Sequence, residues 1–261
     1  MRTTILLDGD AGAQIPLEAP HAVLSGWLDE DHKAAVKPYA LGPPRCVGRR
    51  VGLPVRLLED ALTGRLRRHA VAGATVRLGR HLFCVAATPR TEEHLSWEDL
   101  RGRSGRRAWE VAFRSPTTFR RGSRTSPWPA PDSLLLGLSS RWNALSAQSA
   151  PALTREVMQS LWVSDIDGRS EAIRLRGTVV SGFVGRVRYV CDGSEADAGT
   201  VDALLAFARF AGIGSHTAFA LGTVDVESTW QPSRVTAGAR RGMSPAASSE
   251  AADDRAVAAG R

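Results

Sequence analysis

The sequence has few cysteines and no long apolar run, and both absences narrow the class of protein. Cys46, Cys84 and Cys191 are odd in number and form no C-x-x-C pair, which argues against a disulfide framework and a zinc ribbon. No stretch reaches the length of a membrane span, and the N-terminal MRTTILLDGD lacks the apolar core and cleavage site of a signal peptide. We therefore expect reduced thiols and a cytoplasmic protein.

Several catalytic signatures are missing as well. There is no G-K-[ST] phosphate loop, no dinucleotide fingerprint with a strand before the glycines and a helix after them, and no serine with the partners of a hydrolase triad. No cluster of Asp, Glu, His and Cys has the spacing of metal ligands. The sequence predicts neither a metal ion nor a cofactor.

Positive charge is in excess, and it is concentrated. The 261 residues hold 34 Lys+Arg against 27 Asp+Glu, which gives +7 and favours a polyanionic partner such as nucleic acid. Residues 101–124 contain eight arginines and one acid, with aromatic residues between them. Such a stretch is either a solvated loop or an RNA-binding surface that combines phosphate contacts with base stacking. The predicted RNA contacts in it are Arg114, Arg120, Arg121 and Arg124.

Hydrophobic periodicity predicts an α+β protein with two halves. The first half gives strands at 3–8, 54–59, 74–78, 81–88 and 108–114, and helices at about 17–35 and 60–70, in the order β-α-β-α-β-β-β. The Pro-rich segment SPWPAPD at 126–132 is a predicted joint. We therefore predict an N-terminal domain at 1–125 and a C-terminal domain at 133–231.

The second half ends in a pattern typical of a ferredoxin-like fold. We expect helices at 134–145 and 151–161, strands at 171–180 and 183–191, a helix at about 197–210 and a last strand at 218–227. The final β-β-α-β is the second part of a ferredoxin-like β-α-β-β-α-β arrangement. Residues 232–261 are rich in Ala, Ser, Gly and Arg with almost no large apolar side chain, and we expect them to be a disordered tail.

A glycine-rich segment, AGIGSHTAFALG at 211–222, lies between the last helix and the last strand. Its glycines either let backbone N–H groups approach a phosphate closely or simply form a helix C-cap and a turn. The first interpretation makes this segment an RNA-backbone platform. Its predicted RNA contacts are Gly212, Gly214, Ser215, His216 and Thr217.

Two histidines lie on or near the first predicted helix. On an uninterrupted helix, His21 and His32 share the face of Leu24 and Leu28 but sit about 16 Å apart, too far for a direct acid/base pair. His32 comes five residues before Lys37, and a chain reversal at Pro38 would bring an imidazole and an ammonium to one phosphodiester. A surface histidine at a helix end can also serve electrostatics alone, which is the alternative for His32.

Histidine and lysine together suit RNA cleavage without a metal. Attack by a 2′-OH on the neighbouring phosphorus needs a base for the hydroxyl, a cation for the charge that grows on phosphate, and an acid for the leaving 5′ oxygen. The sequence therefore makes His32 and Lys37 the first catalytic candidates, with His21 third.

Five segments together resemble one family, the CRISPR repeat-processing endoribonucleases, which are the guide-RNA maturation enzymes of the RAMP superfamily. They occur in the family's order and cover most of residues 15–227. The segments are DHKAAVKPYALGPP (31–44), VAFRSPTTFRR (111–121), LLLGLSSRWNAL (134–145), VVSGFVGRVRYV (179–190) and FARFAGIGSHTAFALGTVDVE (207–227).

The resemblance implies two tandem ferredoxin-like domains and metal-independent cleavage of CRISPR repeat RNA at the base of a hairpin, leaving a 2′,3′-cyclic phosphate. The family's usual histidine, ahead of a K/R-P-aromatic stretch, corresponds to His32, and its frequent lysine corresponds to Lys37. His21 is the nearest match to a tyrosine or second histidine that many members carry in the same helix. The family usually has two further glycines near the end of its signature, where this chain has Ala220, Leu221 and Gly222.

Two alternatives share parts of these features. A non-catalytic RNA-binding subunit of a CRISPR ribonucleoprotein complex would have the same fold and glycine-rich segment, with other subunits of that complex as partners. A small-molecule enzyme with a phosphate-binding loop would show an RNA affinity that does not depend on salt.

Overall fold

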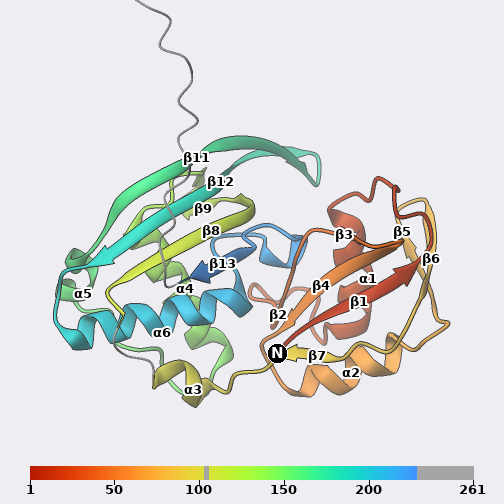
Figure 1. Ribbon diagram of the computed structural model, residues 1–261, viewed down its shortest axis with the longest axis horizontal. Helices are drawn as coiled ribbons and strands as arrows, with labels where there is room; N and C mark the ends of the chain where they lie inside the picture. The colour runs from red at the N-terminus through yellow and green to blue at the C-terminus, as the bar shows by residue number, and fades with distance from the viewer. Residues whose placement is uncertain (103–105, 228–261) are drawn as a thin grey trace, which may run out of the picture. The chain divides into compact units, whose positions relative to one another are not determined.

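The computed structural model describes residues 1–102 and 106–227, which form two larger antiparallel sheets and a separate two-stranded one, together with the helices that pack on them (Figure 1). The expected tail at 232–261 lies outside the described residues. No helix among the described residues is long and apolar enough to cross a membrane. The elements before the second sheet are β1 (Arg2–Asp8), α1 (Glu18–Leu28), β2 (Tyr39–Leu41), β3 (Arg45–Val47), β4 (Arg50–Leu57), α2 (Ala61–His69), β5 (Thr75–Leu78), β6 (His81–Val85), β7 (Thr91–Glu93) and α3 (Trp97–Arg101).

The elements of the second half begin with the strand that follows Arg107. They are β8 (Ala108–Thr117), β9 (Phe119–Arg121), β10 (Arg124–Ser126), α4 (Pro131–Leu145), α5 (Arg155–Ser160), β11 (Leu161–Leu175), β12 (Thr178–Cys191), α6 (Glu195–Ala211), the 3-10 helix η1 (Thr217–Phe219) and β13 (Val224–Glu227).

The first sheet has the strand order β2-β4-β1-β6-β5, with β3 added on β4 and β7 on β1. Its β1-α1-β2-β4-α2-β6 core is a ferredoxin-like unit, and β5 extends the edge. Ile5 and Leu7 alternate with more exposed residues along β1 and pair with Leu53 and Val51 of β4. Their side chains join a core that α1 and α2 cover with residues such as Leu24. This packing fixes the end of α1, where the candidate catalytic residues begin.

The second sheet has the order β11-β12-β8-β13 and is a second ferredoxin-like unit, β8-α4-β11-β12-α6-β13. The tandem ferredoxin-like fold is therefore confirmed. The placement of the strand at 108–114 in the first half was wrong: Val111 of β8 pairs with Val187 of β12 and Val226 of β13. The chain changes sheet between β7 and β8, before the Pro-rich segment 126–132, because β8 is the central strand that the second sheet needs.

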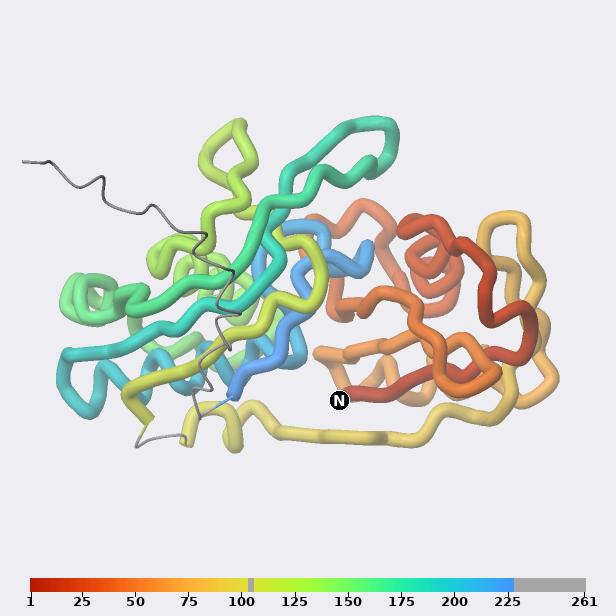
Figure 2. Tube along the Cα trace, turned by 45° about the horizontal axis from the view of Figure 1, so that its top comes forward, coloured from red at the N-terminus to blue at the C-terminus, as the bar shows by residue number. Residues whose placement is uncertain are grey.

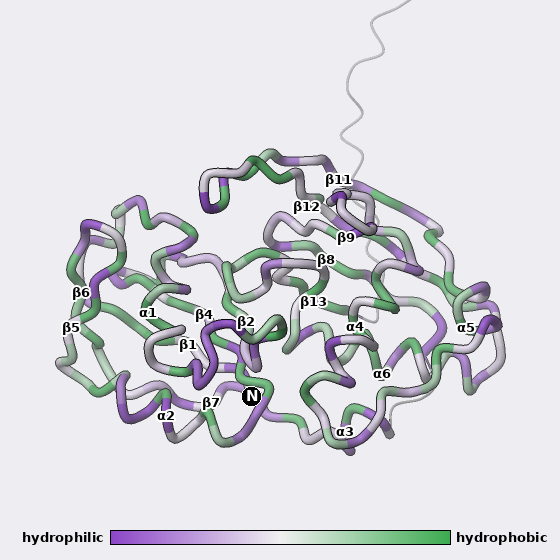
Figure 3. Tube along the Cα trace, turned by 180° about the vertical axis from the view of Figure 1, so that it is seen from behind, coloured by the Kyte–Doolittle hydropathy of each residue, from purple (hydrophilic) through white to green (hydrophobic). Residues whose placement is uncertain are grey.

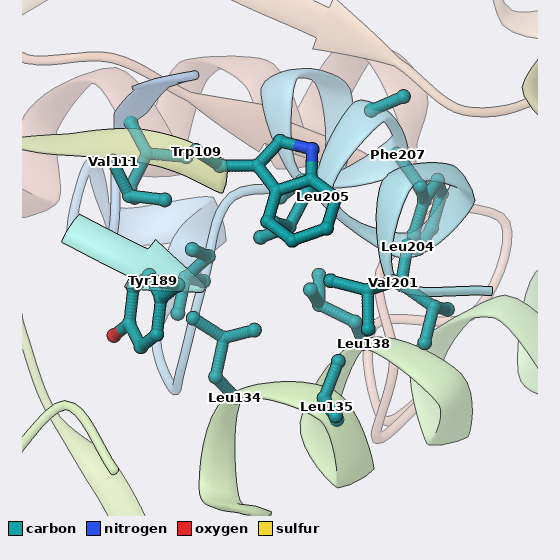
Figure 4. Close-up of a cluster of buried hydrophobic side chains, with 14 of the residues drawn as sticks. Trp109, Val111, Leu134, Leu135, Leu138, Tyr189, Val201, Leu204, Leu205 and Phe207 are labelled. Atoms are coloured by element: carbon teal, nitrogen blue, oxygen red, sulfur yellow. The ribbon is translucent and has the colours of Figure 1, made fainter. Parts of the chain in front are cut away.

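Aromatic and leucine side chains fill the space between the second sheet and its helices (Figure 4). Trp109 of β8 is buried and donates from Nε1 to Asp202 Oδ1 on α6 at 2.6 Å, so the polar edge of the indole is satisfied. Tyr189 donates to the carbonyl of Pro129 at 2.8 Å. The labelled core residues are Trp109, Val111, Leu134, Leu135, Leu138, Tyr189, Val201, Leu204, Leu205 and Phe207.

Two element boundaries differ from the prediction in ways that matter for the site. The first helix ends at Leu28 and not near Ala35, because Asp29 takes an extended conformation (φ −74°, ψ 129°) and turns its side chain inward. The strand pair predicted at 171–180 and 183–191 is a longer hairpin, β11–β12. Its tip carries hydrophilic residues and projects toward the first half (Figures 2 and 3). Edge strand β11 is largely exposed, so it shows no clear hydrophobic alternation.

Candidate active site

The loop that follows α1 gathers two titratable side chains, those of His32 and Lys37, around one carboxylate. Asp29 Oδ2 accepts a hydrogen bond from Lys37 Nζ at 2.6 Å and lies 3.4 Å from His32 Nδ1. The Asp29 side chain is 2% exposed, whereas that of His32 is 69% exposed. Between His32 and Lys37 the chain turns back. Asp31 Oδ1 accepts a hydrogen bond from the N–H of Lys33 at 2.8 Å at the start of this turn. The structure thus brings His32 and Lys37 to the same group.

Lys37 is held from two sides. Besides Asp29, its ammonium donates to the carbonyl of Asp31 at 2.9 Å, and its side chain is 14% exposed. Tyr39 follows on β2 and is fully buried; burial and, after it, the Asp29 carboxylate raise the pKa of its phenol. A fixed, partly buried ammonium is suited to neutralise negative charge that grows on a nearby phosphate.

His21 lies on α1, half-buried, and its ring packs on Phe219 of η1 with 3.8 Å between the ring centroids. Burial lowers its pKa below the usual value for histidine, and the charges of Asp29 and Lys37 also act on it. His21 and His32 do not share one continuous helix, because α1 ends at Leu28. His21 is therefore part of the same electrostatic neighbourhood as Asp29 and Lys37.

The glycine-rich segment is tied to the second half through its backbone. The N–H of Gly212 donates to the Ala208 carbonyl at 2.8 Å, and that of Ser215 donates to the Thr118 carbonyl at 2.8 Å. A Cβ on Gly214 would lie 2.4 Å from the Thr118 carbonyl oxygen, and both glycines have positive φ. These glycines satisfy turn geometry and close packing, and the Gly212 N–H is bonded within the protein.

The three residues after Gly214 have different environments. Thr217 is buried and accepts a hydrogen bond from Arg141 Nη1, so its hydroxyl faces the protein. His216 is half-buried in the left-handed conformation (φ 61°, ψ 30°). Burial lowers the pKa of His216, and the positive charge of Arg120 acts in the same direction. Ser215 lines an open cavity of about 390 Å³.

The predicted arginines divide between two places. Arg120 and Arg121 lie on β9 and line the 390 Å³ cavity, and Arg121 also pairs with Asp132 at 3.0 Å. Arg124 is exposed on the adjacent β10. Arg114 pairs with Asp225 at 2.8 Å and lines a separate cavity of about 320 Å³, so the structure does not bring it together with the β9 arginines.

Three residues of the site were missed in the sequence. Asp29 stands in an acidic run with Glu30 and Asp31, a pattern typical of an exposed segment, and nothing local shows that its carboxylate is buried. Arg141 is the one charged residue of LLLGLSSRWNAL (134–145), which could have marked it as a group with a specific partner. Arg176, at the tip of the β11–β12 hairpin, gives no local signal: its N–H donates to Glu18 Oε1 at 2.9 Å and its guanidinium lies 5.7 Å from the Phe219 ring centroid.

The described residues contain no group of three or more His, Cys, Asp or Glu that could hold a metal ion. The site as described is made of a carboxylate, an ammonium and imidazoles, with arginines on the neighbouring β9.

Residues 111–224 match the family model for the CRISPR-associated endoribonuclease Cas6. The chain also resembles a solved Cas6 product complex with 30% identity and a TM-score of 0.77, and the match covers 87% of this chain and 98% of that one. The chain belongs to the Cas6 family. A Cas6 substrate mimic complex is similar over the same shares, with 30% identity and a TM-score of 0.73.

A curated Cas6 endoribonuclease from Mycobacterium tuberculosis is 27% identical over 123 residues, which is 46% of this chain. The match spans 39% of the length of that relative. Thermus thermophilus Cas6, with 24% identity and a TM-score of 0.66, shares the fold.

Proposed function

We propose that this Cas6 family member is an endoribonuclease that binds CRISPR repeat RNA hairpins and cleaves them into mature guide RNAs without a metal ion. The observation that supports this most is the convergence of His32 and Lys37 on the buried Asp29. The solved Cas6 product and substrate mimic complexes support the same class of activity.

In the proposed reaction, His32 takes the proton of the 2′-OH. Nδ1 of His32 lies 3.4 Å from the Asp29 carboxylate, which favours the tautomer that is protonated there and has Nε2 as the base. The 2′ oxygen attacks the adjacent phosphorus, and the bond from phosphorus to the 5′ oxygen breaks. The products are a 2′,3′-cyclic phosphate and a 5′-OH.

Lys37 supplies positive charge to the phosphate and the proton for the leaving 5′ oxygen. Its position between Asp29 and the Asp31 carbonyl fixes the ammonium before RNA arrives, which reduces the reorganisation that the reaction requires. His21, whose pKa is lowered, is neutral at pH 7 and is the third group of the proposed site.

RNA is held by the second half in this proposal. The contacts are Arg120, Arg121 and Arg124 of the β9–β10 hairpin with Ser215 and His216 of the glycine-rich segment. These residues surround or adjoin the 390 Å³ cavity, and the arginines supply forked donors that suit phosphate oxygens.

The test is cleavage of candidate repeat hairpins by the full chain in EDTA, with mass spectrometry of both product ends. We expect one cut at the base of the hairpin and an upstream product lighter by one water than a linear monophosphate. RNA that is bound tightly but left intact would instead support a non-catalytic subunit of a CRISPR ribonucleoprotein complex. A cut that occurs only when a divalent metal is added would contradict the proposed mechanism.

A further inference from the structure

A buried arginine that the proposed chemistry does not use joins the two halves of the site. Arg141 lies on α4, next to the buried Trp142. Its Nη2 donates to the carbonyls of Lys37 at 3.2 Å and Tyr39 at 3.0 Å, and its Nη1 donates to Thr217 Oγ1. One guanidinium therefore bonds both to the chain at the start of β2 and to η1 of the glycine-rich segment.

The setting of Arg141 makes this geometry specific. Burial lowers its pKa to about 10, and it forms no ion pair with a carboxylate of the described residues. Its Nε is shielded from solvent without a hydrogen-bond partner. Because a buried cation without a carboxylate is costly, the carbonyl and hydroxyl acceptors must be well placed to retain it.

These bonds hold the main chain of Lys37, whereas the Asp29 carboxylate holds its side chain. Arg141 fixes the Lys37 carbonyl, while Asp29 fixes its Nζ. On the other side, Thr217 begins η1, which ends at Phe219 under the ring of His21. A shift of Arg141 would therefore change the spacing between the loop that carries His32 and Lys37 and the glycine-rich segment.

We propose that Arg141 is a positioning residue that, through Thr217, holds Lys37 and His32 in register with RNA bound on the second half. This inference rests on the proposed function, because it concerns the rate of that cleavage. Arg141 touches neither the reacting atoms nor the RNA, and it acts by fixing the main chain at Lys37 and Tyr39.

Thr223, directly after the glycine-rich segment, offers a matched control. Arg56, 4% exposed on β4, donates to Thr223 Oγ1 at 3.3 Å, and Thr223 Oγ1 donates to the Leu41 carbonyl at 3.3 Å. This contact also connects the second half to β2 through a buried arginine and a threonine. It lies at the end of β2 away from Lys37.

The experiment compares Thr217→Val, Thr217→Ser and Thr223→Val in the full chain, by single-turnover cleavage of a repeat hairpin and by RNA affinity. Since small misplacement of reacting groups is costly, we expect Thr217→Val to slow cleavage about 10- to 100-fold with the Kd changed less than about threefold. Thr217→Ser keeps the hydroxyl and should restore most of the rate. Thr223→Val should reduce the rate less than Thr217→Val does.

Arg141→Lys provides a second variant should Thr217→Val fail to fold, because one ammonium cannot reproduce the forked bonds to Lys37, Tyr39 and Thr217. It should slow cleavage at unchanged affinity. Equal rates in wild type and Thr217→Val, or equal losses in Thr217→Val and Thr223→Val, would overturn the inference. A wild-type protein that does not cut RNA would instead remove the proposed function itself.

Discussion

The loop at 29–39 in the first half and the segment at 212–222 in the second use their polar groups in opposite ways. In the loop, charged side chains converge on Asp29 while the His32 ring stays open to solvent. In the glycine-rich segment, the N–H groups of Gly212, Ile213, Ser215 and Gly222 all donate to carbonyls of the protein. The loop leaves the His32 ring open to a substrate, whereas these four backbone donors of the segment are already bonded within the protein.

This difference shows what glycine spacing can indicate. A phosphate needs donors that are not already bonded, so positive φ and small residues alone do not make an anion site. In this protein the arginines of β9, which line the cavity beside Gly214, are better placed to supply such donors.

The largest effect is expected at His32, in the loop after α1. If the loop carries the chemistry, His32→Ala should slow cleavage about 10²- to 10⁴-fold, because the ring acts in the transition state. RNA affinity should stay nearly unchanged. The measurement is the single-turnover rate in EDTA alongside the Kd, and a mutant that cuts at the wild-type rate would remove His32 from the site.

Asp29→Asn tests whether the buried carboxylate organises the loop. The amide keeps the size of the side chain but removes the charge that holds Lys37 and His32, so we expect a loss in cleavage rate of up to about 100-fold. Asp31→Asn is the control, since its carboxylate caps only the N–H of Lys33 while its carbonyl still binds Lys37. Similar rate losses in both variants would show that the net negative charge of the loop matters, and not the contacts of Asp29 with Lys37 and His32.

The structural role of the glycine-rich segment is tested at Gly222. A Cβ there would lie 1.9 Å from the Ile213 carbonyl oxygen, and its φ is +67°. Gly222→Ala should therefore destabilise the fold by about 2–4 kcal/mol. Gly26→Ala in α1 meets no atom within 4 Å and should stabilise by about 0.5–1 kcal/mol. Denaturant unfolding measures both, and a neutral Gly222→Ala would contradict the packing argument.

Two neighbouring arginines test whether RNA binds to the second half. Arg121 already pairs with Asp132, whereas Arg120 forms no ion pair with the described residues. Arg120→Ala should weaken binding across RNA sequences and lower the salt slope by about one for each lost phosphate contact. Arg121→Ala should do so less. Affinities measured over a range of salt decide this, and an unchanged slope in both variants would place RNA elsewhere.

The smallest effect concerns pH and His21. Its pKa is lowered in the folded state, so the unfolded chain binds more protons and stability falls as the pH drops below about 6.5. His21→Phe keeps an aromatic ring against Phe219 and removes the titrating group. Its Tm should fall less between pH 7 and pH 5 than that of the wild type. The pKa of His216 is lowered as well, so the Tm of His21→Phe should still fall somewhat as the pH drops. Tm-against-pH curves that are parallel for the variant and the wild type would contradict the prediction.

Much of the fold followed from local patterns. Alternation in β1 and the apolar face of α6 predicted the elements, and the final β-β-α-β order predicted a ferredoxin-like unit. The errors arose where distant partners decide. Strand β8 was assigned to the first half because nothing local shows that Val111 pairs with Val187 and Val226. The first helix was predicted too long because the contact of Asp29 with Lys37, which lies beyond the helix end, is not visible in the local sequence.

The chemical groups of the site are visible in the sequence alone: an imidazole and an ammonium five residues apart, ahead of a proline and an aromatic residue, and a glycine-rich segment before the last strand. The partners of these groups follow from the three-dimensional fold. Asp29, Arg141 and Arg176 take their roles from partners 8 to 158 residues away along the chain. The physical reason is that hydrogen bonds and burial depend on distance in space, and the sequence records this only when the partners are neighbours along the chain.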